Sequence, residues 1–289
     1  MKKITVLISL IVMAAILLAA CGGSAPKDLL SEIRSRGYML VEVVMYTTTG
    51  QRPANTKCPS DALTIAQIGG FDRDVAAEIG KRLGVETCFV TPDWSTVTAG
   101  SWGGKWDVSI ASMTITNTRA KVLTFTVPYY YDYAYVVVKK GSGINTLADL
   151  NGKAVCAESP TVYEDWLNGK LDLPAADVLA QPPANVKVDA VSNVDDCAQE
   201  PDFGANFMAF VDPSYMVDAD IAGGAPVVKL GSPVFRERMA AAADKSSSLP
   251  TDSFVAELNT IITAMHNDGT LTKFSIQELN GVDYTQLLK

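Results

Sequence analysis

The sequence has little of what many catalytic and metal sites need. It contains a single histidine, His266, no Cys-x-x-Cys pair and no Gly-x-Ser-x-Gly motif. These absences argue against a zinc site and against serine hydrolase chemistry, in which His266 would have to act as the base from a distant helix. No segment is rich in Lys and Arg, and 24 basic residues stand against 32 acidic ones. Nucleic acid is therefore not an expected partner.

Long apolar runs are also absent, except at the N-terminus. Lys2 and Lys3 precede an apolar run from Ile4 to Leu18, and small residues then lead to Cys21. This pattern predicts a signal peptide over residues 1–20. A cysteine directly after the cleavage site resembles a bacterial lipobox, which implies a lipidated Cys21 and a flexible tether over residues 21–27. The alternative is a transmembrane anchor, for which a run of fifteen residues is short.

The rest of the chain has a globular composition and is expected to lie outside the cytoplasmic membrane. With 289 residues, of which 48% are apolar and 19% charged, the chain can bury a large core. Its length suits one large domain or two modest ones.

One stretch, residues 107–131, carries the clearest chemical signal. The apolar run from Val108 to Ala111 is typical of a buried strand, and several Ser and Thr residues follow it before Arg119. Small hydroxyl residues leave backbone groups accessible, and a guanidinium offers a planar fork to a carboxylate. The stretch therefore predicts a receptor for a small zwitterion. The alternative is a strand end with Arg119 in a surface ion pair.

Other motifs occur in a fixed order around this stretch. They are GFD at 70–72 opening a helix, Trp94, GKWDV at 104–108, the T-x-x-R ending at Arg119, and F-x-x-PY at 125–129. This order resembles the family 3 extracellular solute-binding proteins, the polar amino-acid receptors of ABC importers, from about Lys27 to the C-terminus.

The resemblance implies an α/β fold of the two-lobed, type II periplasmic-binding-protein kind. Each lobe would be a mostly parallel sheet flanked by helices, and two hinge crossings would join the lobes. Residues 28–134 and 240–289 would form lobe 1, and residues 135–239 lobe 2. Ala134 to Val138 is the expected first crossing. Met239 to Ala243 is the expected return, although the propensity of this segment alone also allows a helix.

The same resemblance assigns ligand contacts. Arg119 would bind the carboxylate, aided by the hydroxyl or amide of Thr114 and by Thr161. Asp212 would bind the ammonium, with the carbonyl of Ser112 as a second acceptor. These residues would meet in the cleft between the lobes, because strand carboxyl ends face the binding crevice in open parallel sheets.

Three further side chains are candidates for the wall around the ligand side chain. Trp94 and Tyr46 could form it, or could equally be core packing. Glu158 could tune side-chain preference, or could be an exposed carboxylate. Thr161 departs from the family pattern, because the preceding Pro160 removes a backbone donor, and Asp212 could alternatively be a helix cap.

Four cysteines remain once Cys21 is assigned to lipid. An even number in an exported chain predicts two disulfides, and the sequence permits three connectivities. The lobe assignment places Cys58 with Cys88 and Cys156 with Cys197, and we expect these pairs. Residues 47–69 read as an insertion that the first of these disulfides would hold.

The expected function is capture of an amino acid by a monomeric, extracytoplasmic lipoprotein that needs no cofactor. It would deliver its ligand to an ABC permease, with a separate ATPase because this chain has no P-loop. Val44, Met45 and Tyr46 replace the acid that often follows the first strand in receptors for basic amino acids, which disfavours Lys or Arg as ligand. The alternatives are a cyclohexadienyl dehydratase, with Glu158 as general acid, and a sensor for a membrane partner.

Overall fold

The computed structural model describes residues 26–286, apart from 45–46, 193–194, 199–202 and 204–205. The expected signal peptide, the lipidated Cys21, most of the tether and Tyr46 lie outside the described residues. Within the described ranges, no helix combines the length and the apolar character needed to cross a membrane.

The first lobe is built on β1 (Tyr38–Glu42), which pairs in parallel with β5 (Glu86–Val90) and β6 (Val108–Ser109). The helix α3 (Phe71–Leu83) joins β4 (Ile68–Gly69) to β5 and buries Val75, Ile79 and Leu83 against this sheet. Its apolar residues recur at the spacing of one helix face, as the sequence predicts. Gly84 ends it in the left-handed conformation, which glycine adopts without steric cost.

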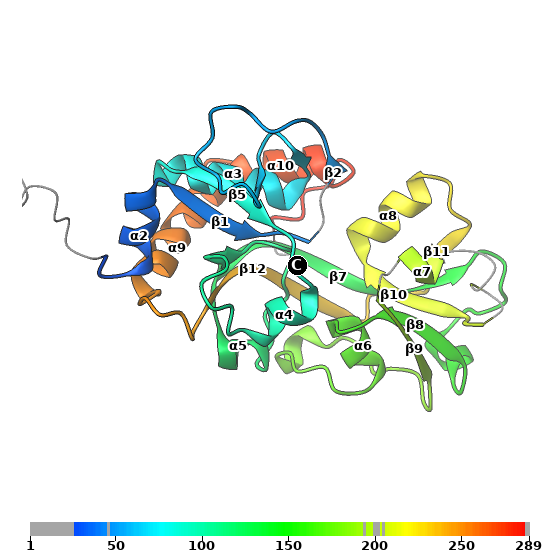
Figure 1. Cartoon of the computed structure of the whole chain (residues 1–289). Helices are drawn as coiled ribbons and strands as arrows, with labels where there is room; N and C mark the ends of the chain where they lie inside the picture. Colours follow the sequence, from blue (N-terminus) through cyan, green and yellow to red (C-terminus); the bar gives the residue numbers. More distant parts are fainter. Residues whose placement is uncertain (1–25, 45–46, 193–194, 199–202, 204–205, 287–289) are drawn as a thin grey trace, which may run out of the picture.

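Two long strands connect the lobes. β7 (Leu123–Lys139) and β12 (Phe235–Asp244) pair antiparallel, from Leu123 opposite Asp244 to Ala134 opposite Phe235. They make one sheet continuous through the molecule, in the order β3-β5-β1-β6-β12-β7-β10-β8-β9 with β11 beside β7. Figure 1 shows the lobes on either side of this pair. The predicted lobe boundaries, 134/135 and 239/240, fall inside these two strands and stay a prediction.

The second lobe is built on β8 (Ala154–Glu158), which lies between the parallel strands β9 (Lys187–Val191) and β10 (Ala209–Pro213). Strand β11 (Val227–Lys229) extends its sheet. Separate clusters of buried side chains fill the two lobes. The remaining helices of this lobe are α6 (Val162–Leu167), α7 (Asp195–Ala198) and α8 (Ser214–Ala222), with short 3-10 turns η1 (Leu147–Leu150) and η2 (Ala175–Asp177).

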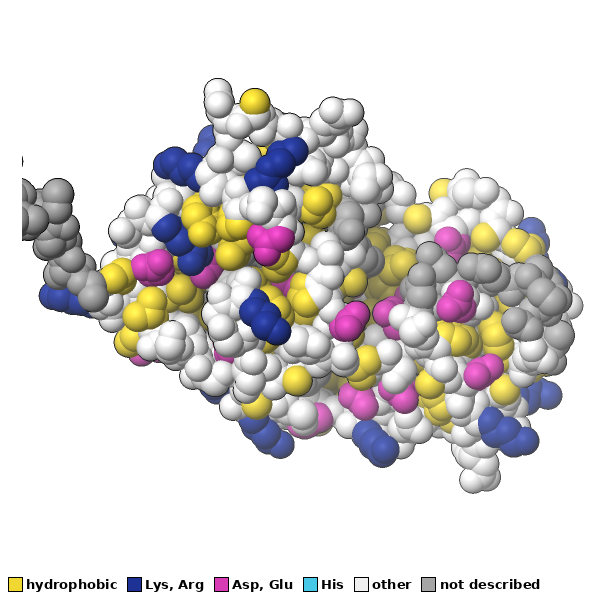
Figure 2. Space-filling view, in the orientation of Figure 1, with side chains coloured by type: hydrophobic (Ala, Val, Ile, Leu, Met, Phe, Trp, Pro, Cys, Tyr) yellow, Lys and Arg dark blue, Asp and Glu magenta, His cyan; other side chains and the backbone are white. Residues whose placement is uncertain are grey.

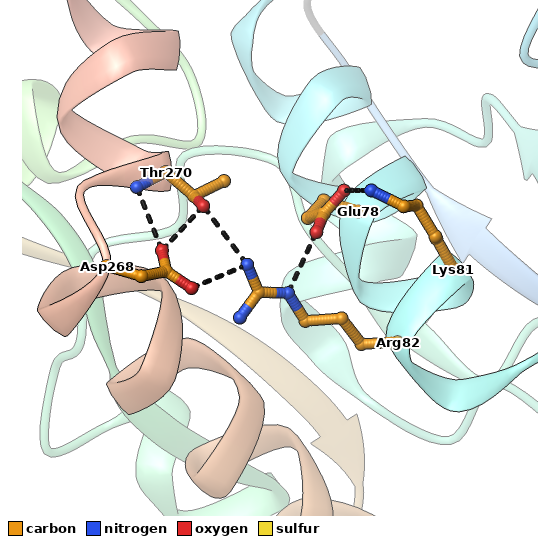
Figure 3. A network of polar contacts seen from close by, with 5 residues as sticks. All are labelled: Glu78, Lys81, Arg82, Asp268 and Thr270. Atoms are coloured by element: carbon orange, nitrogen blue, oxygen red, sulfur yellow. Dashed lines mark hydrogen bonds and ion pairs between the residues drawn. The ribbon is translucent and has the colours of Figure 1, made fainter.

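The C-terminal helices return to the first lobe. α9 (Asp252–Asn267) buries Phe254, Leu258 and Ile262 in the first-lobe core, beside the N-terminal helix α2 (Leu29–Arg36). The following helix, α10 (Thr270–Glu278), was not predicted from the sequence. Figure 3 shows how Arg82 of α3 binds Asp268 and Thr270 at the α9–α10 junction, at 2.9 and 3.0 Å, while Glu78 holds its Nε.

The segment 47–69, predicted to be an insertion, is held by side-chain and covalent links. It contains β2 (Thr47–Thr48) and β3 (Leu63–Thr64). The guanidinium of Arg52 donates to the carbonyls of Cys58, Pro59 and Ala62. The disulfide Cys58–Cys88 fixes the loop to β5, and Cys156–Cys197 fixes α7 to β8. Both predicted pairings are therefore present in the structure.

Candidate ligand-binding site

A cavity of about 410 Å³ lies between the lobes, where β6, β8 and β10 end. Its walls come from both sides of the crossing strands. Seven of the eight predicted contact residues line it: Trp94, Ser112, Thr114, Arg119, Glu158, Thr161 and Asp212. The eighth, Tyr46, lies outside the described residues. On the visible face of the molecule, acidic side chains lie along the junction of the lobes and over the second lobe (Figure 2).

Arg119 begins α5 (Arg119–Val122) and extends its guanidinium into the wall of the first lobe. Its Nη1 donates to the carbonyl of Thr114 at 3.0 Å, and its Cζ lies 5.3 Å from the ring centroid of Trp94. Burial lowers the pKa of Arg119 to about 10, so the side chain stays charged at neutral pH. Within the part of the chain that the structure describes, no carboxylate forms an ion pair with it.

Asp212 lies on the opposite wall, near the end of β10, and is only 3% exposed. Its backbone pairs with Tyr135 of β7, which fixes its position at the strand end. Among the described residues, its carboxyl group has no hydrogen-bond or ion-pair partner. Burial, then the charges of Asp220 and Glu237, raise its pKa well above the usual range. A buried carboxyl without a partner is costly, and such groups concentrate at functional sites.

Ser112 is held by two residues from distant motifs. Its Oγ donates to Asp72 Oδ2 at 2.8 Å, and its amide donates to Tyr129 Oη at 2.9 Å. Tyr129 in turn donates to Asp72 Oδ1 at 2.7 Å. These bonds secure Ser112 at a φ of 50°, a left-handed conformation that non-glycine residues seldom adopt. The position of Asp72 in the sequence suggests a helix cap, but Gly70 is the N-cap of α3. Asp72 instead anchors Ser112, directly and through Tyr129.

The two predicted threonine hydroxyls are engaged within the protein. Thr114 Oγ1 donates to Glu237 Oε1 at 2.7 Å. Thr161 is the N-cap of α6, and its hydroxyl donates to the carbonyl of Glu158. Thr114 lies opposite Met239 of β12 in an antiparallel bridge. The backbone hydrogen bonds of this bridge are made by the neighbouring residues, from the amide of Ile115 to the carbonyl of Arg238 and from the amide of Ala240 to that of Met113. The amide of Thr114 therefore points away from β12, and it is the amide that can serve a ligand.

A model of the bacterial extracellular solute-binding proteins, family 3, matches residues 47–278. The chain belongs to this family.

Named relatives of this family 3 protein bind different amino acids. The L-cystine-binding protein TcyJ of Escherichia coli (strain K12) is 32% identical over 145 residues, which cover 50% of this chain and 51% of that protein. The glutamine-binding protein GlnH of Bacillus subtilis (strain 168) is 33% identical over 165 residues, 52% of this chain and 56% of that protein. The chain thus spans little more than half of these curated relatives.

Solved structures extend the likeness over most of the chain. An ancestral arginine-binding protein bound to arginine is 28% identical, with a TM-score of 0.65 over 84% of this chain and 98% of that one. The two-lobed fold expected from the sequence is therefore confirmed.

Several residues that line the cavity of this solute-binding protein were not predicted. They include Tyr130, Tyr163, Tyr215, Met216 and Met239. Tyr130 directly follows the PY motif, and Met239 begins the segment predicted to return between the lobes. Because both segments were expected at the cleft, their large side chains could have been proposed from position alone. Tyr163 and Met216 lie in the first turns of α6 and α8, just beyond strand ends.

Proposed function

We propose that this protein captures a free α-amino acid in the cavity and delivers it to an ABC import permease. The observation that carries the proposal is the pairing of Arg119 with Asp212. They line one cavity from different lobes, they have opposite charges when ionised, and neither has an ion-pair partner among the described residues. A zwitterion supplies one partner for each.

The two ends of the ligand would be held as follows. Its carboxylate binds the guanidinium of Arg119 and the amide of Thr114. Its ammonium binds the carboxylate of Asp212 and the carbonyl of Ser112, which the anchor formed by Asp72 and Tyr129 keeps in place. Charge-assisted hydrogen bonds of this type each contribute roughly 1.5 to 3 kcal/mol.

Contacts from both lobes make binding and closure a single event. A ligand held by Arg119 and Asp212 together stabilises the arrangement in which the two walls are close. The lobes already contact each other beside Arg119, where Asn117 and Thr118 donate to Asp172 at 2.7 and 3.0 Å. The closed form would be the form that the permease recognises.

The leader sequence supports an anchored receptor. Cleavage before Cys21 and acylation of its sulfur would hold a monomer at the outer face of the cytoplasmic membrane, where a permease and a separate ATPase complete the importer. A dehydratase on the same fold would instead use Glu158, which lines the cavity, as its acid. Turnover of prephenate or arogenate by the purified protein would favour that alternative.

A thermal-shift screen of the twenty protein amino acids tests the proposal. At least one amino acid should raise the unfolding temperature of the wild-type protein. Arg119→Met should abolish that shift, whereas Lys121→Met, two residues away at an exposed position, should preserve it. A screen without any shift, or an Arg119→Met variant that binds like wild type, would contradict the proposal.

A further inference from the structure

The two strands that join the lobes, β7 and β12, place two acidic side chains opposite each other. Glu237 of β12 pairs with Asp132 of β7 in the antiparallel ladder, and each residue is 1% exposed. Directly opposite residues in such a ladder point to the same face of the sheet. Two carboxyl groups are therefore buried side by side between the lobes.

Glu237 contacts a cavity-lining residue from each lobe. Thr114 of the first lobe donates to its Oε1 at 2.7 Å. Tyr163 of the second lobe donates to its Oε2 at 3.1 Å and lies 3.3 Å from Oε1. Both partners line the cavity that holds Arg119 and Asp212. The side chain of Glu237 on β12 thus links one lining residue of each wall.

We propose that Glu237 is a positioning residue of the binding site, which joins Thr114 to Tyr163 across the hinge and leaves Arg119 available to the ligand. The proposal rests on the proposed function, since it concerns the same cavity. It adds a residue that does not itself touch the ligand but sets the distance between the walls that do. It also gives the site a charge that changes with pH.

The groups that face Glu237 determine that charge. Asp132 on β7 and Asp212 on β10 repel it, Arg119 on α5 attracts it without forming an ion pair, and Tyr163 and Tyr215 face it from α6 and α8.

Other charged groups nearby have partners of their own. On β12 itself, Arg236 and Arg238 bind Asp177. Asp132 is bonded by Ser214 Oγ and by the amides of Tyr133 and Tyr215, and Lys229 acts on it from β11.

Near neutral pH these surroundings keep Glu237 mostly protonated. Burial, then repulsion by Asp132, raise its pKa to about 8, against the hydrogen bonds from Thr114 and Tyr163. Hydroxyl groups can donate or accept, so both bonds persist in either protonation state. Once Glu237 ionises above about pH 8, its charge attracts Arg119 and competes with the ligand carboxylate. Affinity should therefore fall on the alkaline side.

Two substitutions separate the linking role from the charge. Glu237→Gln can still form the two hydrogen bonds but cannot ionise. Glu237→Leu can neither form these hydrogen bonds nor ionise. Glu278→Gln, at the exposed end of α10, is the matched control. The dissociation constant is measured by titration calorimetry at pH 6, 7, 8 and 9, with each of the twenty protein amino acids as a separate probe.

We expect Glu237→Gln to bind within about threefold of wild type at pH 7 and to keep its affinity at pH 9, where wild type loses about tenfold for one unit above its pKa. Glu237→Leu should bind at least tenfold more weakly at every pH. Ionisation of the ligand ammonium affects all variants equally. An identical alkaline loss in Glu237→Gln and wild type, or unchanged binding by Glu237→Leu, would overturn the proposal.

A second measurement without ligand distinguishes failure of this proposal from failure of the proposed function. The unfolding temperature of the wild type should fall relative to that of Glu237→Gln between pH 5 and pH 8, because the folded wild type keeps the proton of Glu237 in this range while the unfolded chain releases it. If no amino acid binds but this difference appears, only the amino-acid function is wrong. If the two proteins show the same pH profile, the role of Glu237 is wrong.

Discussion

Arg119 and Asp212 lie on opposite walls of one cavity, Asp212 buried and Arg119 half-buried, and neither has an ion-pair partner in the described part of the chain. Isolated buried charges are among the costliest features a fold can carry. In the proposed function, one small zwitterion bound between the two walls would pair with both side chains. Four predictions test this arrangement and the residues that support it.

Removing the acid of this pair should weaken binding. Asp212→Asn keeps the shape of the side chain but loses the charge that an ammonium needs, and we expect at least a tenfold rise in the dissociation constant, from a loss of roughly 1.5 to 3 kcal/mol. Calorimetry with the amino acid found in the screen measures it. Asp189→Asn, at an exposed position of β9, is the control and should bind like wild type.

Binding should also release a proton from Asp212. Its pKa is raised well above the usual range in the empty cavity, and a bound ammonium lowers it again. Between these two values the affinity should rise with pH, and the observed heat should depend on the ionisation enthalpy of the buffer. Titrations in two buffers at one pH measure the released protons. Equal heats in both buffers would argue against a protonated Asp212.

Stability of the ligand-free protein should decrease from about pH 5 to pH 8. Burial raises the pKa of Glu42 to about 8 and that of Asp132 to about 7, so the folded state binds more protons than the unfolded state in this range. Each such group then lowers the free energy of unfolding by about 1.4 kcal/mol per pH unit. Urea unfolding at several pH values measures the slope, which Glu42→Gln should reduce.

The anchor beneath Ser112 should matter for affinity although it does not face the ligand. Asp72→Ala leaves the hydroxyls of Ser112 and Tyr129 without their shared acceptor. We expect about tenfold weaker binding, because the carbonyl of Ser112 is no longer held in its left-handed conformation. Asp74→Ala, on the same helix and half-buried, controls for general effects on α3. Wild-type affinity in Asp72→Ala would show that Ser112 holds its position without this support.

Local signals in the sequence were sufficient for much of the fold. The spacing of Val75, Ile79 and Leu83 followed by Gly84 indicates α3, and Gly37 likewise ends α2 in the left-handed conformation. The return strand shows the limit of such signals. Its run of alanines favours a helix, but pairing with β7 along the whole of β12 overrides that propensity. Only the likeness to a family placed this segment correctly.

Residues that line the cavity were predictable where a charged residue lies in a family motif, as Arg119 does, or near the end of a buried strand, as Asp212 does. It was less predictable where the role depends on a partner far away in the chain. Asp72 has the local appearance of a cap, and its true partners are 40 and 57 positions away. Glu237 had no local signal, since its two partners come from separate lobes and its neighbour Asp132 comes from the other hinge strand.

The unbroken sheet has a mechanical consequence. Because β7 and β12 are hydrogen-bonded neighbours that run through the whole molecule, the two halves share a narrow ribbon and not two separate linkers. A two-stranded ribbon bends out of its own plane more readily than it shears. The two lobes should therefore rotate about a single hinge axis. Substitutions in the part of β7 and β12 between the lobes, at positions that do not line the cavity, would then change how far the lobes open, without changing the residues that line the cavity.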